Sequence, residues 1–370
     1  MLTREVLVGL DSTSKPEFET IVAGAGPAGI MAAIKAAEAG RVLLVDSSAF
    51  PRDKSCGGMI HEQARKGLDR IAKVPDELLL DPGHVNFRYW DWDRSIKKAT
   101  ALRFLNVNRI AFDDWMLSLL PSNVEVVGST SLVGFSQTPK GVTVSLKSAD
   151  SVEEVQCATL IGADGARSAV RRGLGVDNVS TYVTLQDFVT LDGAIEPFFD
   201  CIYMRDIGDD FAYAYVVPKG ETAIIGSVFY PKTRRPHLKQ DQCIEILRTK
   251  LPQLGESVKR EASVALHVRS MADVVPGQGR VLLAGEAGGF MSPTSGEGIS
   301  YAINSGYYAG QAVATSNPED RLAEHTRLTS GIAGNIRRKF RWLPIMESRT
   351  GKYVAGFVPT PIVSKITEGL

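Results

Sequence analysis

Three closely spaced glycines near residue 20 carry the clearest chemistry in the sequence. Gly24, Gly26 and Gly29 follow an apolar, strand-like segment and lead into an Ala-rich, helix-like one. The first glycine can make a tight turn, the second lets backbone N–H groups approach a pyrophosphate, and the third lets helix and strand pack closely. Pro27 and Ala28 begin the helix, whose N-terminus adds partial positive charge. The pattern predicts a dinucleotide-binding turn.

The next apolar segment ends in an acid. Asp46 follows the run 42–45, about 20 residues after the glycines, where a carboxylate can accept hydrogen bonds from ribose hydroxyls. Glycine turns without a ligand are common, but this triplet lies inside a complete strand, turn, helix and strand unit with a terminal acid. We therefore expect Asp46 to hold the adenosine ribose of a dinucleotide.

Cysteines and histidines predict no metal site. The four cysteines are widely spaced and form no CxxC pair, which argues against zinc and against a disulfide framework. The five histidines have no spacing typical of a metal site or a catalytic triad. The cysteine pattern therefore fits a reducing compartment, and no histidine is assigned a catalytic or metal-binding role.

Length and charge limit the number of domains and the kinds of partner that the chain is expected to have. A chain of 370 residues exceeds what one core usually serves, so two domains are expected. Its 42 basic and 42 acidic residues balance, so no nucleic-acid partner is expected. Residues 1–15 contain acids and a polar Asp-Ser-Thr-Ser run instead of an uninterrupted apolar region, and no apolar stretch reaches the ~20 residues of a membrane span. We expect a cytoplasmic protein, or at most one peripheral to a membrane.

Four elements, in this order, resemble the flavoprotein monooxygenase superfamily typified by aromatic hydroxylases. They are the glycine turn with Asp46, the stretch 109–115, the sequence Gly-Ala-Asp-Gly at 162–165, and the loop 285–298 that follows a buried strand-like segment. Together they span most of residues 18–315.

Two further segments resemble the geranylgeranyl reductase-like branch of that superfamily. One is Lys-Ser-Cys-Gly-Gly at 54–58, and the other is the aromatic segment 213–220. The second segment also resembles an aromatic motif of flavin-dependent halogenases, with tyrosines in place of tryptophans.

The resemblance implies FAD and a particular α/β fold. A three-segment FAD-binding Rossmann-like domain (18–60, 106–175 and 276–316) is expected beside a substrate domain built on an antiparallel β-sheet (61–105 and 176–275) and a helical C-terminal region (317–370). In the family, the loop 285–298 follows the ribityl chain, and the helix after it stabilises negative charge on the flavin. NAD(P)H as a transient donor and a separate electron donor are both admissible, because only one dinucleotide fingerprint is visible.

The resemblance also implies a set of cofactor-binding residues. Arg109 matches an FAD-contacting arginine, although a surface charge is the alternative, and Asp164 either orders a loop against FAD or is an ordinary turn residue. Glu286 replaces the usual aspartate and can still accept a ribityl hydroxyl. The full set is Gly24, Gly26, Pro27, Ala28, Gly29, Asp46, Arg109, Asp164, Gly285, Glu286, Pro293, Gly296, Gly298 and Ile299.

The expected activity is an FAD-dependent oxidoreductase that acts on an apolar small molecule or lipid. If the resemblance extends to chemistry, reduced flavin delivers hydride to an isoprenoid C=C bond, and Cys56, Tyr213 and Tyr215 are the catalytic candidates. Two alternatives are a monooxygenase, in which the reduced flavin meets O₂, and an accessory flavoprotein that modifies a partner.

The segment 336–343 sets four cations among apolar and aromatic residues. This composition suits peripheral membrane contact. The alternative is a last helix that packs its Ile, Phe, Trp and Leu on the core.

Overall fold

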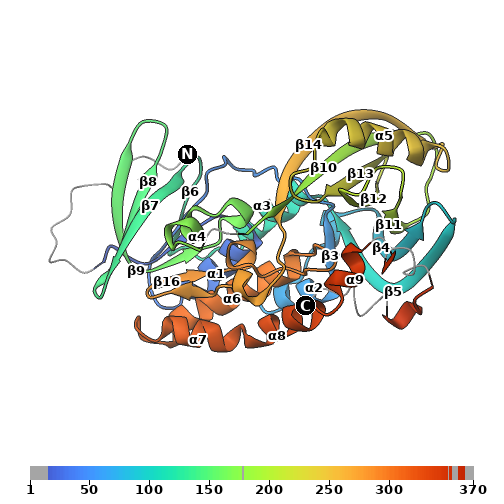
Figure 1. Ribbon diagram of the computed structural model, residues 1–370. Coiled ribbons are helices and arrows are strands. Elements are labelled where there is room, and N and C mark those ends of the chain that lie inside the picture. The colour runs from blue at the N-terminus through green and yellow to red at the C-terminus, as the bar shows by residue number, and fades with distance from the viewer. Residues whose placement is uncertain (1–15, 177–178, 349, 352–356, 363–370) are drawn as a thin grey trace.

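The computed structural model describes residues 16–176, 179–348, 350–351 and 357–362 (Figure 1). Two eight-stranded sheets organise these residues, and helices cover them. The first sheet contains β1 (Phe18–Ala23), β2 (Val42–Val45), β6 (Val124–Val127), β7 (Ser131–Thr138), β8 (Gly141–Lys147), β9 (Val152–Gly162), β15 (Gly277–Gln278) and β16 (Val281–Leu283). The second contains β3 (Met59–His61), β4 (Leu79–Asp91), β5 (Ile96–Val107), β10 (Thr181–Leu191), β11 (Phe198–Tyr203), β12 (Phe211–Lys219), β13 (Thr222–Phe229) and β14 (Leu254–Leu266).

The first sheet has the order β15-β16-β9-β1-β2-β6, and its five strands from β16 to β6 run parallel. The hairpin β7–β8 adds to β9 in antiparallel fashion. Every residue of β2 and β16 is buried, as expected for parallel strands covered on both faces. The α/β, Rossmann-like class predicted from the sequence is confirmed.

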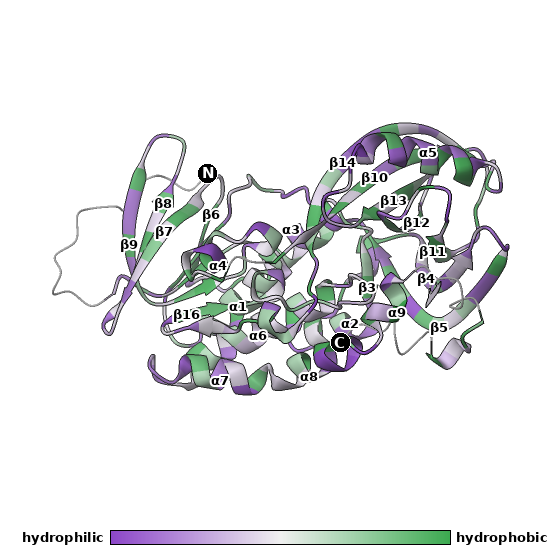
Figure 2. Cartoon of the chain, viewed as in Figure 1, coloured by the Kyte–Doolittle hydropathy of each residue, from purple (hydrophilic) through white to green (hydrophobic). Residues whose placement is uncertain are grey.

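Two helices pack together against this sheet because glycines let their backbones meet. These are α1 (Pro27–Ala36) and α6 (Ile299–Thr315), which lie side by side in Figure 1 and are largely apolar in Figure 2. A Cβ at Gly306 would stand 2.1 Å from the Ala28 carbonyl oxygen, and one at Gly29 would stand 1.7 Å from that of Gly24. The helix–strand and helix–helix contacts therefore both require glycine.

The second sheet has the order β14-β10-β13-β12-β11-β4-β5-β3. All its pairings are antiparallel except that of β11 with β4, which is parallel, so the predicted antiparallel sheet needs this one correction. Successive side chains of β12 point to opposite faces of the sheet, and the side chains on both faces are largely apolar. Ala214 and Val216 pack in the core that includes α5 (Pro236–Arg248), whereas Tyr213 and Tyr215 line a cavity on the other face.

The remaining helices are α2 (Glu62–Leu68), α3 (Arg109–Ser118), α4 (Ala169–Gly173), α7 (Arg321–Leu328), α8 (Ser330–Lys339) and α9 (Leu343–Glu347). A buried histidine ties α7 to the first sheet, because His325 Nε2 lies 2.9 Å from the Leu283 carbonyl oxygen. Burial lowers the pKa of His325 to about 4, so the ring is neutral at pH 7. The predicted helical C-terminal region is seen over residues 321–347, and residues 349, 352–356 and 363–370 of that region lie outside the described residues. The division into domains at the predicted boundaries stays a prediction.

None of the helices in the described part of the chain is long and apolar enough to cross a membrane. Across those same residues, no group of three His, Cys, Asp or Glu side chains could hold a metal ion.

Candidate functional site

A cavity of about 1130 Å³ lies where the carboxyl ends of the parallel strands face the second sheet. Ala23, Asp46 and Ala163, which end or follow β1, β2 and β9, line it on one side. Ligands of open α/β sheets bind at this edge. The volume lies just above the upper end of the range of about 300–1,000 Å³ typical of ligand pockets, which suits a ligand as large as a dinucleotide.

The glycine turn forms one wall of the cavity. Gly24 has a φ of +101°, and a Cβ there would lie 2.4 Å from the Ala163 carbonyl oxygen. Gly26 is the N-cap of α1, and no side chain caps that helix end. The first turn of α1 is thus free to offer its N–H groups to an anion. Gly29 does not line the cavity and supports the turn from behind.

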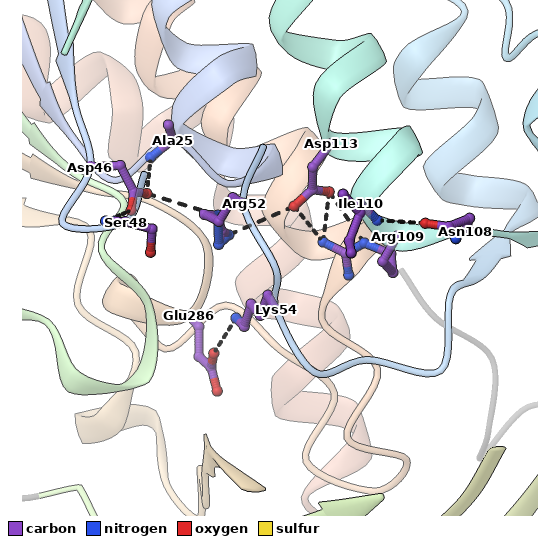
Figure 3. Close-up of polar contacts among 10 residues, drawn as sticks. All are labelled: Ala25, Asp46, Ser48, Arg52, Lys54, Asn108, Arg109, Ile110, Asp113 and Glu286. Carbon is purple, nitrogen blue, oxygen red and sulfur yellow. Dashed lines mark hydrogen bonds and ion pairs between the residues drawn. The ribbon is translucent and has the colours of Figure 1, made fainter. Parts of the chain in front are cut away.

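Asp46 braces the turn. Its Oδ2 accepts a hydrogen bond from the Ala25 N–H at 2.8 Å, and its Oδ1 accepts one from the Ser48 N–H at 2.8 Å (Figure 3). A carboxylate oxygen can accept more than one bond, and Asp46 lines the cavity. The bond between Asp46 and a ribose stays a prediction. The structure shows a second role for Asp46, because its two hydrogen bonds hold the turn in shape.

Sequence reasoning missed Arg52. Its guanidinium lies over the glycine turn, because a Cβ on Gly26 would fall 2.7 Å from Arg52 Nη2. Ion pairs of 3.9 Å to Asp46 and 3.8 Å to Asp113 hold it on either side, both longer than a hydrogen bond (Figure 3). Its buried Nε finds no hydrogen-bond partner among the described residues. A phosphate placed on the turn would supply that partner, so this cradle fits a pyrophosphate.

Arg109 is the first residue of α3, whose N-cap Asn108 accepts bonds from two backbone N–H groups. The Arg109 side chain is 9% exposed and lines the cavity, which rules out the surface-charge alternative. It donates to Asp113 at 2.8 Å, and Cys56 lies close to the same guanidinium. Burial opposes its charge, but Asp113 and Cys56 outweigh burial and raise the pKa of Arg109.

Asp164 orders its loop. The carboxylate accepts bonds from the Ala169 and Val170 N–H groups at 2.6 and 3.2 Å, and from the Ser168 hydroxyl. Burial raises the pKa of Asp164 despite these bonds. The side chain also lines the cavity, so the loop-ordering role is seen and contact with a cofactor stays a prediction.

The loop 285–298 supplies another part of the wall. Glu286 accepts the Leu266 N–H at 2.7 Å and lies 3.9 Å from Lys54 Nζ. Gly298 is the N-cap of α6, and the Glu297 carboxylate beside it accepts the Ser300 N–H at 2.7 Å, so the start of that helix lines the cavity with one of its N–H groups already bonded. Four predicted residues of the loop and helix line the cavity with Glu286, namely Pro293, Gly296, Gly298 and Ile299. Gly285 does not line it, and its N–H donates to Ser305 Oγ behind the loop.

The second sheet makes the opposite wall apolar and aromatic. The Tyr213 hydroxyl donates to the Ser295 carbonyl at 3.1 Å, and the Tyr215 hydroxyl donates to Gln186 Oε1 at 3.1 Å. The ring of Tyr215 lies over Gly226 on the paired strand, where a Cβ would stand 1.9 Å from it. Burial raises the pKa of both tyrosines, which keeps both phenols protonated at neutral pH.

Cys56 lies between the two walls. It lines the cavity beside Arg109, and the amine of Lys219 lies behind the same loop, because a Cβ at Gly58 would fall 2.8 Å from Lys219 Nζ. Lys219 donates to Asn106 Oδ1 at 2.6 Å and to the Val107 carbonyl at 3.1 Å. Burial lowers the pKa of Lys219 to about 7. Lys219 belongs to the aromatic segment 213–220, but its approach to the loop of Cys56 could not be predicted, because it depends on how β12 pairs in the sheet.

Known proteins match both the sequence and this geometry. Residues 118–323 match the family described as FAD binding domain. Protein CbrA of Escherichia coli O9:H4 is 31% identical over 323 residues, which cover 84% of this chain and 85% of CbrA. The chain belongs to the FAD-binding domain family. CbrA of Shigella dysenteriae serotype 1 is also 31% identical, over 299 residues that cover 78% of this chain and 82% of that protein.

Solved structures share the fold at lower identity. A geranylgeranyl bacteriochlorophyll reductase-like protein from Thermoplasma acidophilum has a TM-score of 0.76 at 19% identity, over 95% of this chain and 91% of its own. The flavin-dependent halogenase CmlS has a TM-score of 0.71 at 16% identity, over 96% of this chain and 70% of its own. This chain is an FAD-dependent oxidoreductase with FAD as its cofactor, and it shares the fold of these flavoproteins.

Proposed function

We propose that this protein uses FAD to reduce carbon–carbon double bonds of an apolar, isoprenoid-like molecule. The observation that carries the proposal is the predominance of apolar and aromatic side chains on the wall opposite the glycine turn, which suits a hydrocarbon. That wall includes Phe87, Tyr89, Phe104, Phe199, Tyr213, Tyr215, Val228 and Met291. The fold shared with a geranylgeranyl bacteriochlorophyll reductase-like protein supports the same reaction.

The residues around the glycine turn would hold the cofactor. The N–H groups of α1 and the guanidinium of Arg52 would bind the diphosphate, and Asp46 the ribose. Glu286 and the N-terminal end of α6 would face the ribityl and ring portions, as the loop 285–298 lines the same cavity. Bound FAD, once reduced by two electrons from NAD(P)H or a separate donor, would supply the electron pair as a hydride.

The chain must supply a proton, because reduction adds a hydride to one carbon and a proton to the other. Cys56 suits this role, since its thiol faces the cavity and the thiolate left behind would lie beside Arg109 and near Lys219. The hydroxyl of Tyr215 already donates to Gln186. Tyr215 therefore orients and shields the substrate, and Cys56 donates the proton.

An anaerobic experiment tests the reaction class. The holoprotein is reduced with dithionite, excess reductant is removed, and a polyprenyl lipid or a phenol is added while the flavin absorbance is recorded. We expect reoxidation by the polyprenyl lipid without O₂. Reoxidation that requires O₂ together with a phenol would replace the reductase with a monooxygenase. Turnover with NADH or NADPH under the same conditions would identify the electron donor.

A further inference from the structure

The cavity reaches the surface between α8 and α9. Trp342 and Ile345 line the cavity, and they are 38% and 45% exposed, so they form part of its mouth. Leu343 and Met346, on the same short segment, continue the apolar lining inward. An apolar molecule that enters through this mouth would therefore contact apolar side chains from the surface inward.

Three cations stand next to the mouth. Arg337 and Arg338, near the end of α8, and Arg341 are all exposed. Within the described residues, no ion pair joins any of the three to a carboxylate. The chain as a whole has no net charge, so these unpaired cations form a local feature that differs from the average surface.

Buried side chains and a polar contact attach the segment 336–343 to the rest of the protein. Ile336 and Leu343 are buried, and Lys339 Nζ lies 3.2 Å from Ser292 Oγ in the loop 285–298. The core-packing alternative thus holds for Ile336 and Leu343, and Phe340 packs partly buried against the same core, whereas Trp342 is 38% exposed. Since this anchored segment holds Trp342 and the arginines outward, the surface is preformed.

We propose that the face made by Arg337, Arg338, Arg341, Trp342 and Ile345 docks on an anionic lipid bilayer, with the cavity mouth against the membrane. Cations attract phospholipid phosphates, and Trp and Ile side chains enter the boundary between headgroups and acyl chains. Charge complementarity favours this occupant. An apolar substrate could then pass from bilayer to cavity without crossing water, and only this last step rests on the proposed function.

Flotation of the full-length holoprotein with vesicles tests the docking. Vesicles of phosphatidylcholine alone are compared with vesicles that also contain phosphatidylglycerol, at low and high salt. We expect salt-sensitive binding to the anionic vesicles. Each cation near an anionic surface contributes about fivefold to affinity, so Arg337→Gln with Arg338→Gln should weaken binding about 25-fold. Lys140→Gln with Lys147→Gln removes the same charge from exposed sites around the β7–β8 hairpin, far from α9 in Figure 1, and should change binding little.

Tryptophan fluorescence separates membrane insertion from simple charge attraction. Trp342 is the exposed one of the four tryptophans, since Trp90 and Trp92 are buried and Trp115 is partly buried. Brominated phosphatidylcholine in the anionic vesicles should quench a component of the emission that Trp342→Phe removes. Absence of binding, equal weakening by the two double variants, or absence of that quenching would each overturn the docking. None of these results depends on turnover, so the reductase proposal is tested separately.

Discussion

Replacing Arg52 by Met gives the sharpest test of the cofactor cradle. Met keeps most of the aliphatic part of the Arg52 side chain but lacks the guanidinium that lies over Gly26. A hydrogen bond to a charged group contributes about 1.5–3 kcal/mol, so the Kd for FAD should rise about 10- to 150-fold. Folding should change much less, because Asp113 keeps its bond to Arg109 and Asp46 keeps its two backbone donors.

The assay is titration of the apoprotein with FAD, followed by quenching of flavin fluorescence. The Kd of Arg52→Lys for FAD should lie between those of wild type and Arg52→Met. Lys keeps the positive charge but lacks the planar guanidinium, which can donate two parallel hydrogen bonds to a phosphate. Arg41→Met is the matched control, because Arg41 is 55% exposed and pairs only loosely with Glu125 at 3.5 Å. Circular dichroism of each apoprotein checks folding. An unchanged Kd in a folded Arg52→Met variant would refute the assignment of Arg52 to the diphosphate.

Three further predictions address the remaining groups. Asp46→Asn should weaken FAD by about 1–3 kcal/mol in equilibrium dialysis, and an unchanged Kd would leave Asp46 a purely structural role. Cys56→Ser should slow anaerobic flavin reoxidation about 100-fold or more with FAD content unchanged, whereas a lower melting temperature at unchanged rates would make Cys56 a packing residue. Lys219 has a folded-state pKa of about 7 against 10.5 for the free side chain, so the unfolded chain binds more protons between these values. Its contribution to the free energy of unfolding should rise with pH through that window, by at most about 1.4 kcal/mol per pH unit, and Lys219→Met should remove the rise in denaturant titrations.

The sequence predicted the parts of the site that local patterns determine. The glycine turn, the acid after β2 and the loop before α6 each follow from spacing within one strand–turn–helix unit, and all border the cavity. The tyrosines of β12 were found through the resemblance, and strand alternation places both of them on the cavity face.

Contacts between distant segments could not be predicted in the same way. Arg52 follows Asp46 closely, yet its position depends on Asp113 of α3 and on the absence of a side chain at Gly26. The place of Tyr215 depends on Gly226, which only the register of β12 with β13 brings beneath the ring. A basic residue soon after the acid of a dinucleotide unit was the one local signal that could have drawn attention to Arg52.

The mass of the product after one anaerobic turnover tests the central claim most directly. Reduced holoprotein is mixed with an excess of polyprenyl lipid in the absence of O₂, and the extracted lipid is analysed by mass spectrometry. The account predicts a product heavier by two hydrogen atoms, in an amount equal to the flavin reoxidised. A lipid recovered unchanged without O₂, together with a product that gains one oxygen atom when O₂ is admitted, would contradict it.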